Sequence, residues 1–181
     1  SISYSQFSQW DKCPYMWKLN YVDRLSVFTD NIHTLFGTSM HEVLQEYLKV
    51  MYTQSIKEAD QLYLDEQLED RLKKNFLEIV KKNGGDEFCT KDQMVEFYED
   101  GLKILDYFKK KRNMYFSKRG YELVGIETAL DYGLPKNIKF RGYIDLIIKD
   151  TVRNRIKIID IKTATHGWNK YQKADKNKTD Q

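Results

Sequence analysis

Residues 140–163 read FRGYIDLIIKDTVRNRIKIIDIKT, and the rest of the chain is organised around them. Two apolar runs flank a polar turn near residues 151–154, a pattern that predicts a β-hairpin. Asp145 lies inside the first run, and Asp160 and Lys162 close the second. An unpaired buried carboxylate is costly, so charged residues inside apolar strands require a partner or a ligand. The stretch therefore predicts a functional site.

The spacing of these charges suits phosphodiester hydrolysis. Asp145 and Asp160 are 15 positions apart across the turn, so a hairpin can bring them within about 5 Å of each other. Two carboxylates that close repel unless a cation lies between them, and oxygen ligands favour Mg²⁺ or Mn²⁺ over Zn²⁺. Lys162 leaves the same strand face as Asp160. A metal and an ammonium group aimed at one point can bind a phosphate and orient a water.

The remaining patterns place helices before the hairpin. Helices are expected over residues 3–21 (two short ones), 30–54, 58–82 and 90–112, and strands over 121–132, 140–149 and 155–162. Near-continuous apolar strands predict a sheet covered on both faces. We therefore expect an α/β fold with a small mixed central sheet flanked by helices. A single domain over residues 1–181 would comprise a helical part over about 1–118, a catalytic sheet over about 120–164 and a lysine-rich loop over 165–181.

Two features of the helical half have a structural and a functional interpretation. His41 borders the apolar stripe of the helix expected over residues 30–54, where a lone histidine is more often a core residue than a ligand. The aromatic residues of the segment 3–21, among them Tyr4, Phe7 and Trp10, favour core packing. The alternative for these rings is stacking of bases along a substrate path.

Composition narrows the class of protein. With 181 residues and 41% hydrophobic content the chain can bury one core. Two cysteines form no disulfide framework and favour a reducing cytosol, and no apolar run resembles a membrane span or a signal peptide, so no membrane partner is expected. Residues 136–181 carry 12 Lys and Arg against 5 Asp and Glu. That balance suits a polyanionic partner and equally a solvated basic tail.

Taken together, the motifs resemble the RecB-like branch of the PD-(D/E)xK nuclease superfamily. In chain order they are Gly37-x-x-x-His41-x-x-Leu44, Gly142-x-x-Asp145-Leu146 and Ile158-Ile159-Asp160-Ile161-Lys162-Thr163, preceded by Ser3-x-Ser5 and Cys13-Pro14. Together they cover nearly the whole chain in the order of that branch. Each motif alone is weak, because Asp-x-Lys occurs by chance in many proteins.

The resemblance assigns roles to individual residues. It implies that His41, Asp145 and Asp160 bind the metal together with the backbone carbonyl of Ile161, and that Lys162 positions or activates the attacking water. The catalytic residues would thus be Asp145, Asp160 and Lys162.

Three further residues have weaker assignments. Glu127 matches a strand acid that precedes the Gly-x-x-Asp motif and is an occasional metal ligand or a neighbour of the ligands. Arg141 and Thr163 could contact phosphate, but a salt bridge and a strand-end hydroxyl explain them at least as well.

The chain departs from the branch in two places. The branch continues with Gln-x-x-x-Tyr on a helix, and Gln181 could be its first residue, so we expect an incomplete C-terminus. Some members bind an iron–sulfur cluster through a cysteine at the position of Cys13 and three more near the C-terminus. Those three are missing from this sequence, so we expect no cluster and interpret Cys13 as a small buried residue.

Three functions remain open from the sequence. The first is a metal-dependent deoxyribonuclease, an exonuclease on ends of linear single- or double-stranded DNA in replication, recombination, repair or a phage setting. The second is a catalytically silent, nuclease-like DNA-binding module in a larger DNA-processing complex. The third is an RNA-directed enzyme. The presence of His41, Asp145, Asp160 and Lys162 argues against the second, because a binding module needs none of them.

Overall fold

A computed structural model describes residues 1–26 and 29–163, so the predicted lysine-rich loop over 165–181 lies outside the described residues. Within the described residues, seven helices lie between β1 and β2, and one short 3-10 helix lies between β2 and β3. The helices are α1 (Tyr4–Lys12), α2 (Pro14–Trp17), the π-helix η1 (Lys18–Val22), α3 (Ile32–Thr53), α4 (Ile56–Asp60), α5 (Leu64–Lys82) and α6 (Lys91–Tyr115). The strands are β1 (Ile2–Ser3), β2 (Tyr121–Leu134), β3 (Ile138–Asp150) and β4 (Arg155–Ile159), with the 3-10 helix η2 (Pro135–Asn137) between β2 and β3.

Local signals account for where several helices begin. The Ser3 side chain caps α1, Pro14 occupies the first turn of α2, and Thr90 and Gln93 form the capping box expected at the start of α6. The segment expected as one helix over 58–82 is instead α4 and α5, separated at residues 61–63.

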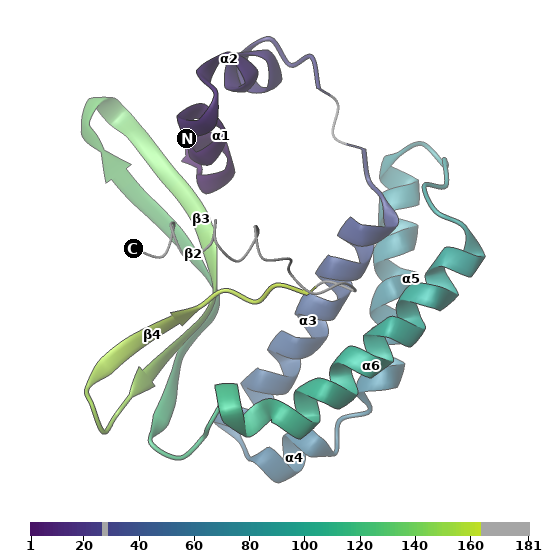
Figure 1. Cartoon of the computed structure of the whole chain (residues 1–181), viewed down its shortest axis with the longest axis vertical. Helices are drawn as coiled ribbons and strands as arrows, with labels where there is room; N and C mark the ends of the chain where they lie inside the picture. The colour runs from purple at the N-terminus through teal and green to yellow at the C-terminus, as the bar shows by residue number, and fades with distance from the viewer. Residues whose placement is uncertain (27–28, 164–181) are drawn as a thin grey trace.

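The four strands form one mixed sheet with β3 at its centre. Strand β2 pairs antiparallel with β3 along most of its length. The other edge of β3 is shared, since β1 pairs parallel with one end of it and β4 antiparallel with the other. Figure 1 shows this sheet on one side of the molecule and the bundle of α3, α5 and α6 on the other.

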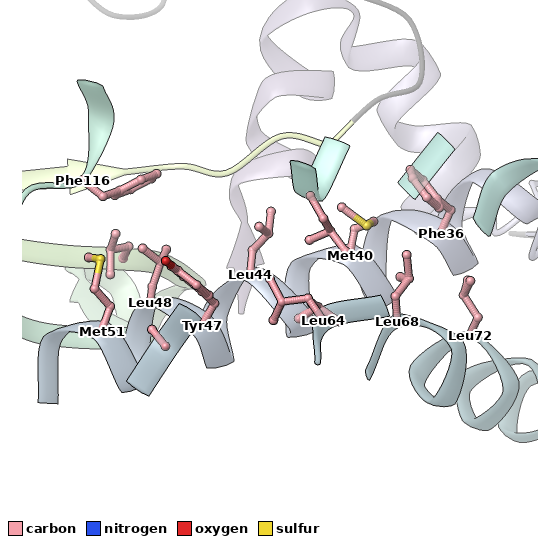
Figure 2. Close-up of a cluster of buried hydrophobic side chains, with 14 of the residues drawn as sticks. Phe36, Met40, Leu44, Tyr47, Leu48, Met51, Leu64, Leu68, Leu72 and Phe116 are labelled. Atoms are coloured by element: carbon pink, nitrogen blue, oxygen red, sulfur yellow. The ribbon is translucent and has the colours of Figure 1, made fainter. Parts of the chain in front are cut away.

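Helix α3 is the centre of the core. It contacts α4, α5, α6 and β2, and its buried side chains meet leucines of α5 in Figure 2, including Leu64, Leu68 and Leu72. Leu146 and Ile148 of β3 complete the core from the sheet side. Burying a large apolar side chain contributes about 1.5–3 kcal/mol to stability, so α3 is held in place on several sides.

A polar network joins α3, α4 and α6 at the edge of this core. Tyr47 donates a hydrogen bond to Asp60 over 2.6 Å, and Arg112, whose side chain is 11% exposed, contacts both residues. Burial raises the pKa of Tyr47 to about 12. Burial alone would raise the pKa of Asp60 too, but hydrogen bonds from Tyr47 and Arg112 outweigh it and hold that pKa below its ordinary value. The network fixes the end of α6 against α3.

Two expectations about burial are wrong. The sheet is covered on one face only within the described chain, because the outer side chains of Tyr143, Ile156 and Ile158 are 70%, 56% and 67% exposed. Helices α1 and α2 have no buried residue, so their aromatic rings do not pack into a core. Both differences have one cause. In the described chain the bundle of α3, α5 and α6 lies on a single side of the sheet, and α1 and α2 stand apart from that bundle (Figure 1).

Cys13 also differs from the expectation of a buried residue. It is only partly buried, and its Sγ accepts a hydrogen bond from the backbone N–H of Met16 over 3.4 Å, at the start of α2. Its side chain serves as a helix cap, and an apolar burial site is not available because α1 and α2 lie at the surface.

Candidate functional site

The hairpin brings Asp145 and Asp160 to adjacent positions. Leu146 pairs with Ile159 as the last residue pair of the β3–β4 ladder, so the next step along both strands reaches Asp145 and Asp160. The ladder ends there because the Oδ2 atom of Asp145 accepts the backbone N–H of Ile161 over 2.7 Å. The second strand was expected to run to residue 162, and this side-chain hydrogen bond explains why β4 stops at Ile159.

The opposite edge of β3 adds a third carboxylate to this row. Leu146 pairs with Ile126 on β2, which places Glu127 beside Asp145 on the neighbouring strand. Glu127 has a backbone φ of +48°, a conformation that a residue other than glycine rarely adopts. Its carboxylate accepts a hydrogen bond from the side-chain amide of Gln45 on α3. The positions of Glu127, Asp145 and Asp160 therefore form one row across three strands.

Helix α3 places a histidine over the middle of the row. The Nε2 atom of His41 lies 3.2 Å from Oδ2 of Asp145, and the two side chains are 25% and 13% exposed. That Nε2 atom is buried and has no hydrogen-bond partner among the described residues. Gln45 follows His41 by one helical turn, so a single face of α3 reaches both Asp145 and Glu127.

At the end of the row, Lys162 pairs with Asp160. Its Nζ atom lies 2.8 Å from Oδ1 of Asp160, with both side chains more than half exposed. The expectation that the two side chains lie on the same side of the chain agrees with this contact. Asp160 therefore faces Lys162 in this structure, while Asp145 faces His41.

An open cleft of about 330 Å³ reaches both residues of the first pair and Lys162 of the second. It is lined by Thr34, Gly37, Thr38, His41, Asp145, Ile161, Lys162 and Thr163. A Cβ atom added at Gly37 would meet no heavy atom within 4 Å. Gly37, one turn before His41, thus leaves this part of the cleft wall without a side chain.

The His41–Asp145 pair fits a divalent cation better than a structural ion pair. An imidazole nitrogen that is buried, without a hydrogen-bond partner and next to a carboxylate oxygen has the donor chemistry of a metal ligand. Within residues 1–26 and 29–163, however, no three His, Cys, Asp or Glu side chains converge into a metal-binding group. The structure brings together two of the expected ligands and leaves Asp160 and Glu127 with other partners.

The other residues singled out in the sequence divide between the cleft and the surface. Thr163 lines the cleft. Arg141 lies outside it and pairs with Asp131 over 3.1 Å, between the neighbouring strands β3 and β2, as a structural salt bridge would. Sequence reasoning missed Gln45, and the signal that could have found it is its four-residue spacing from His41 on one helix face.

The fold and the site together define a class of protein: a mixed sheet, flanked by helices, that carries acidic residues and an Asp-x-Lys segment at the ends of neighbouring strands. The chain belongs to the PD-(D/E)XK nuclease superfamily, whose family model matches residues 1–181. Searches among curated proteins and among solved structures return no match. No helix within the described residues is long and apolar enough to cross a membrane.

Proposed function

We propose that this chain is a metal-dependent deoxyribonuclease of the RecB-like branch, acting as an exonuclease on the ends of linear DNA. The observation that carries the proposal is that His41, Asp145 and Lys162 line one open cleft, with His41 next to Asp145 and Lys162 paired with Asp160. The membership in a superfamily of nucleases supports the activity class. A role in replication, recombination, repair or phage biology follows from the same resemblance.

The proposed metal ligands are His41, Asp145, Asp160 and the backbone carbonyl of Ile161, with Glu127 as a further acid in the row. Oxygen donors with one imidazole favour Mg²⁺ or Mn²⁺. Such a cation, when bound, polarises the phosphate and lowers the pKa of a water molecule. Asp160 can join the ligands without repacking of the core, because it lies beyond the end of β4 and its side chain is 53% exposed.

Two side chains have roles beyond holding the metal. Lys162 orients the attacking water and neutralises charge that develops on the phosphate oxygens. Asp145 accepts the backbone N–H of Ile161 and thereby positions the backbone that leads into Lys162.

The test compares the parent with Asp160→Ala and Lys162→Ala, using Mn²⁺-dependent release of label from end-labelled linear DNA and Mn²⁺ binding by calorimetry. Asp160→Ala is expected to lose metal binding and cleavage together. Lys162→Ala is expected to keep metal binding and to lose cleavage by about 100-fold or more. Lys103→Ala is the matched control, because Lys103 is also an exposed lysine ion-paired with a nearby aspartate, at 2.9 Å from Asp100.

Three outcomes would change the proposal. Equal cleavage by all variants would show that the site assignment is wrong. Cleavage of circular as well as linear DNA would replace an exonuclease by an endonuclease, and preferential cleavage of labelled RNA would change the substrate.

A DNA-binding module without turnover is the second candidate. It is favoured by one observation, the lack of three converging metal-ligand side chains in the described part of the chain. Binding of labelled DNA by the parent without Mn²⁺-dependent cleavage, and without calorimetric Mn²⁺ binding, would favour this candidate over the enzyme.

A further inference from the structure

A second hollow lies on the other side of the segment that carries Lys162. It has a volume of about 310 Å³ and lies between α3, α6 and residues 161–163. Ile161, Lys162 and Thr163 line both this pocket and the cleft with His41 and Asp145. Whatever occupies the pocket is therefore close to the site proposed for the chemistry.

The inside of the pocket is apolar and aromatic. Leu44 and the rings of Phe108 and Phe116 line it, and the two ring centroids are 5.7 Å apart. Its volume lies at the lower end of the range for small-ligand pockets, about 300–1,000 Å³. Such a space suits one planar ring system better than a large ligand.

The rim of the pocket carries aromatic rings and positive charge. Tyr107 and Tyr115, which are 55% and 59% exposed, line it from α6. Lys111 is four residues from each of them and contributes to the electrostatics of Tyr115, so the three form one stripe on the helix. The neighbouring Tyr107 side chain raises the pKa of Tyr115 above its ordinary value.

We propose that this pocket receives an unpaired base of the nucleotide next to the cleaved phosphate, so that the preferred substrate is a single-stranded DNA end. The inference rests on the proposed nuclease function. Aromatic faces alternating with lysines are the combination that binds single strands, because bases stack on the rings and the cations attract the backbone. Lys162 lies on the wall shared with the cleft, where a phosphate attached to the stacked nucleotide would be. A base held in a duplex cannot enter the pocket.

The test removes a base of the strand and the tyrosine rings of the pocket, singly and together, as in a double-mutant cycle. DNA binding is measured by fluorescence anisotropy in EDTA, so that no cleavage occurs. The probe is a labelled oligothymidylate in which one abasic position is moved along the strand. The parent is compared with the double variant Tyr107→Ala/Tyr115→Ala. Tyr63→Ala is the control, because Tyr63 is 71% exposed, lies outside the lining of the pocket and makes no side-chain capping bond.

The parent is expected to bind about 5- to 30-fold more weakly when one particular position is abasic. The double variant is expected to bind the intact strand more weakly by a similar factor and to show no further loss at that position, because the base and the rings form one interaction. Its melting temperature is expected to remain within about 2 °C of the parent, since both tyrosines are more than half exposed.

Several results would overturn the inference. One is an abasic effect that is equal at all positions or unchanged in the double variant. Another is unaltered binding by a double variant that is clearly destabilised, which would mean that the chain itself fills the pocket. Tighter binding of a blunt duplex or of oligouridylate would also overturn it. In each of these cases, Mn²⁺-dependent cleavage by the parent would leave the proposed function standing. A parent that neither binds nor cleaves DNA would overturn the inference and the proposed function together.

Discussion

The substitution Gly37→Ala is expected to stabilise the fold and to weaken the enzyme. Gly37 lies inside α3, and a Cβ atom there would meet no heavy atom within 4 Å. Replacing glycine by alanine within a helix contributes about 0.5–1 kcal/mol, because the unfolded chain loses conformational freedom. In a protein of this size that energy corresponds to a rise in melting temperature of about 1–4 °C.

Gly37 also lines the cleft that contains His41 and Lys162, so the variant adds a methyl group at the wall of that cleft. If DNA approaches this wall closely, kcat/KM for the labelled DNA falls by about tenfold or more, since small displacements of a substrate from the catalytic groups are costly. The measurements are thermal unfolding by circular dichroism and Mn²⁺-dependent cleavage under single-turnover conditions.

Gly101→Ala is the matched control, because it makes the same chemical change at a closed position. A Cβ atom at Gly101 would lie 2.4 Å from Cδ2 of Leu68 and 3.2 Å from Cε2 of Phe36. Overpacking of this kind costs about 1–3 kcal/mol, which exceeds the helix-propensity gain, so the melting temperature is expected to fall by about 2–8 °C. A lower melting temperature for Gly37→Ala would refute the openness of the cleft at this position. Unchanged cleavage by that variant would refute the approach of substrate over Gly37.

Three further substitutions test the stability of the fold. Tyr47→Phe removes the hydroxyl group that binds Asp60 and is expected to lower the free energy of unfolding by about 1–2 kcal/mol in urea at pH 7. The pKa of Asp60 is lowered in the folded protein, so its contribution to stability is present above the ordinary value of 3.8 and is lost as pH falls. Asp60→Asn should therefore flatten the acid limb of the plot of stability against pH, and an unchanged limb would contradict this. Asp150 accepts a hydrogen bond from the backbone N–H of Arg153 over 2.9 Å, which lowers the pKa of Asp150. Asp150→Ala is therefore expected to destabilise the protein at pH 7 and to lose less further stability than the parent on acidification. Urea titrations from pH 7 to pH 3 would measure both effects.

Much of the local structure could be predicted from neighbouring residues. Ser3, Pro14 and the pair Thr90 and Gln93 occupy the helix starts that their side chains favour. Such signals act within one turn of chain, through hydrogen bonds to nearby N–H groups and fixed backbone angles, and they need no tertiary context.

The hairpin register was also accessible from the sequence. The turn at residues 151–154 and the apolar runs around it imply that Asp145 and Asp160 are neighbours, as the last residue pair of β3 and β4 indicates. The end of β4 could not be predicted, because it depends on the side chain of Asp145 taking the N–H of Ile161 in place of a backbone carbonyl.

Most helices and strands, the order of the motifs and the facing acids of the hairpin could be predicted from the sequence, since these depend on contacts close along the chain. Tertiary structure alone decided that His41 contacts Asp145, that Gln45 binds Glu127, and that the outer face of the sheet stays open in the described chain. Those contacts join segments far apart in sequence. Their geometry follows from how α3 packs between the sheet and the other helices, and no local pattern encodes that packing.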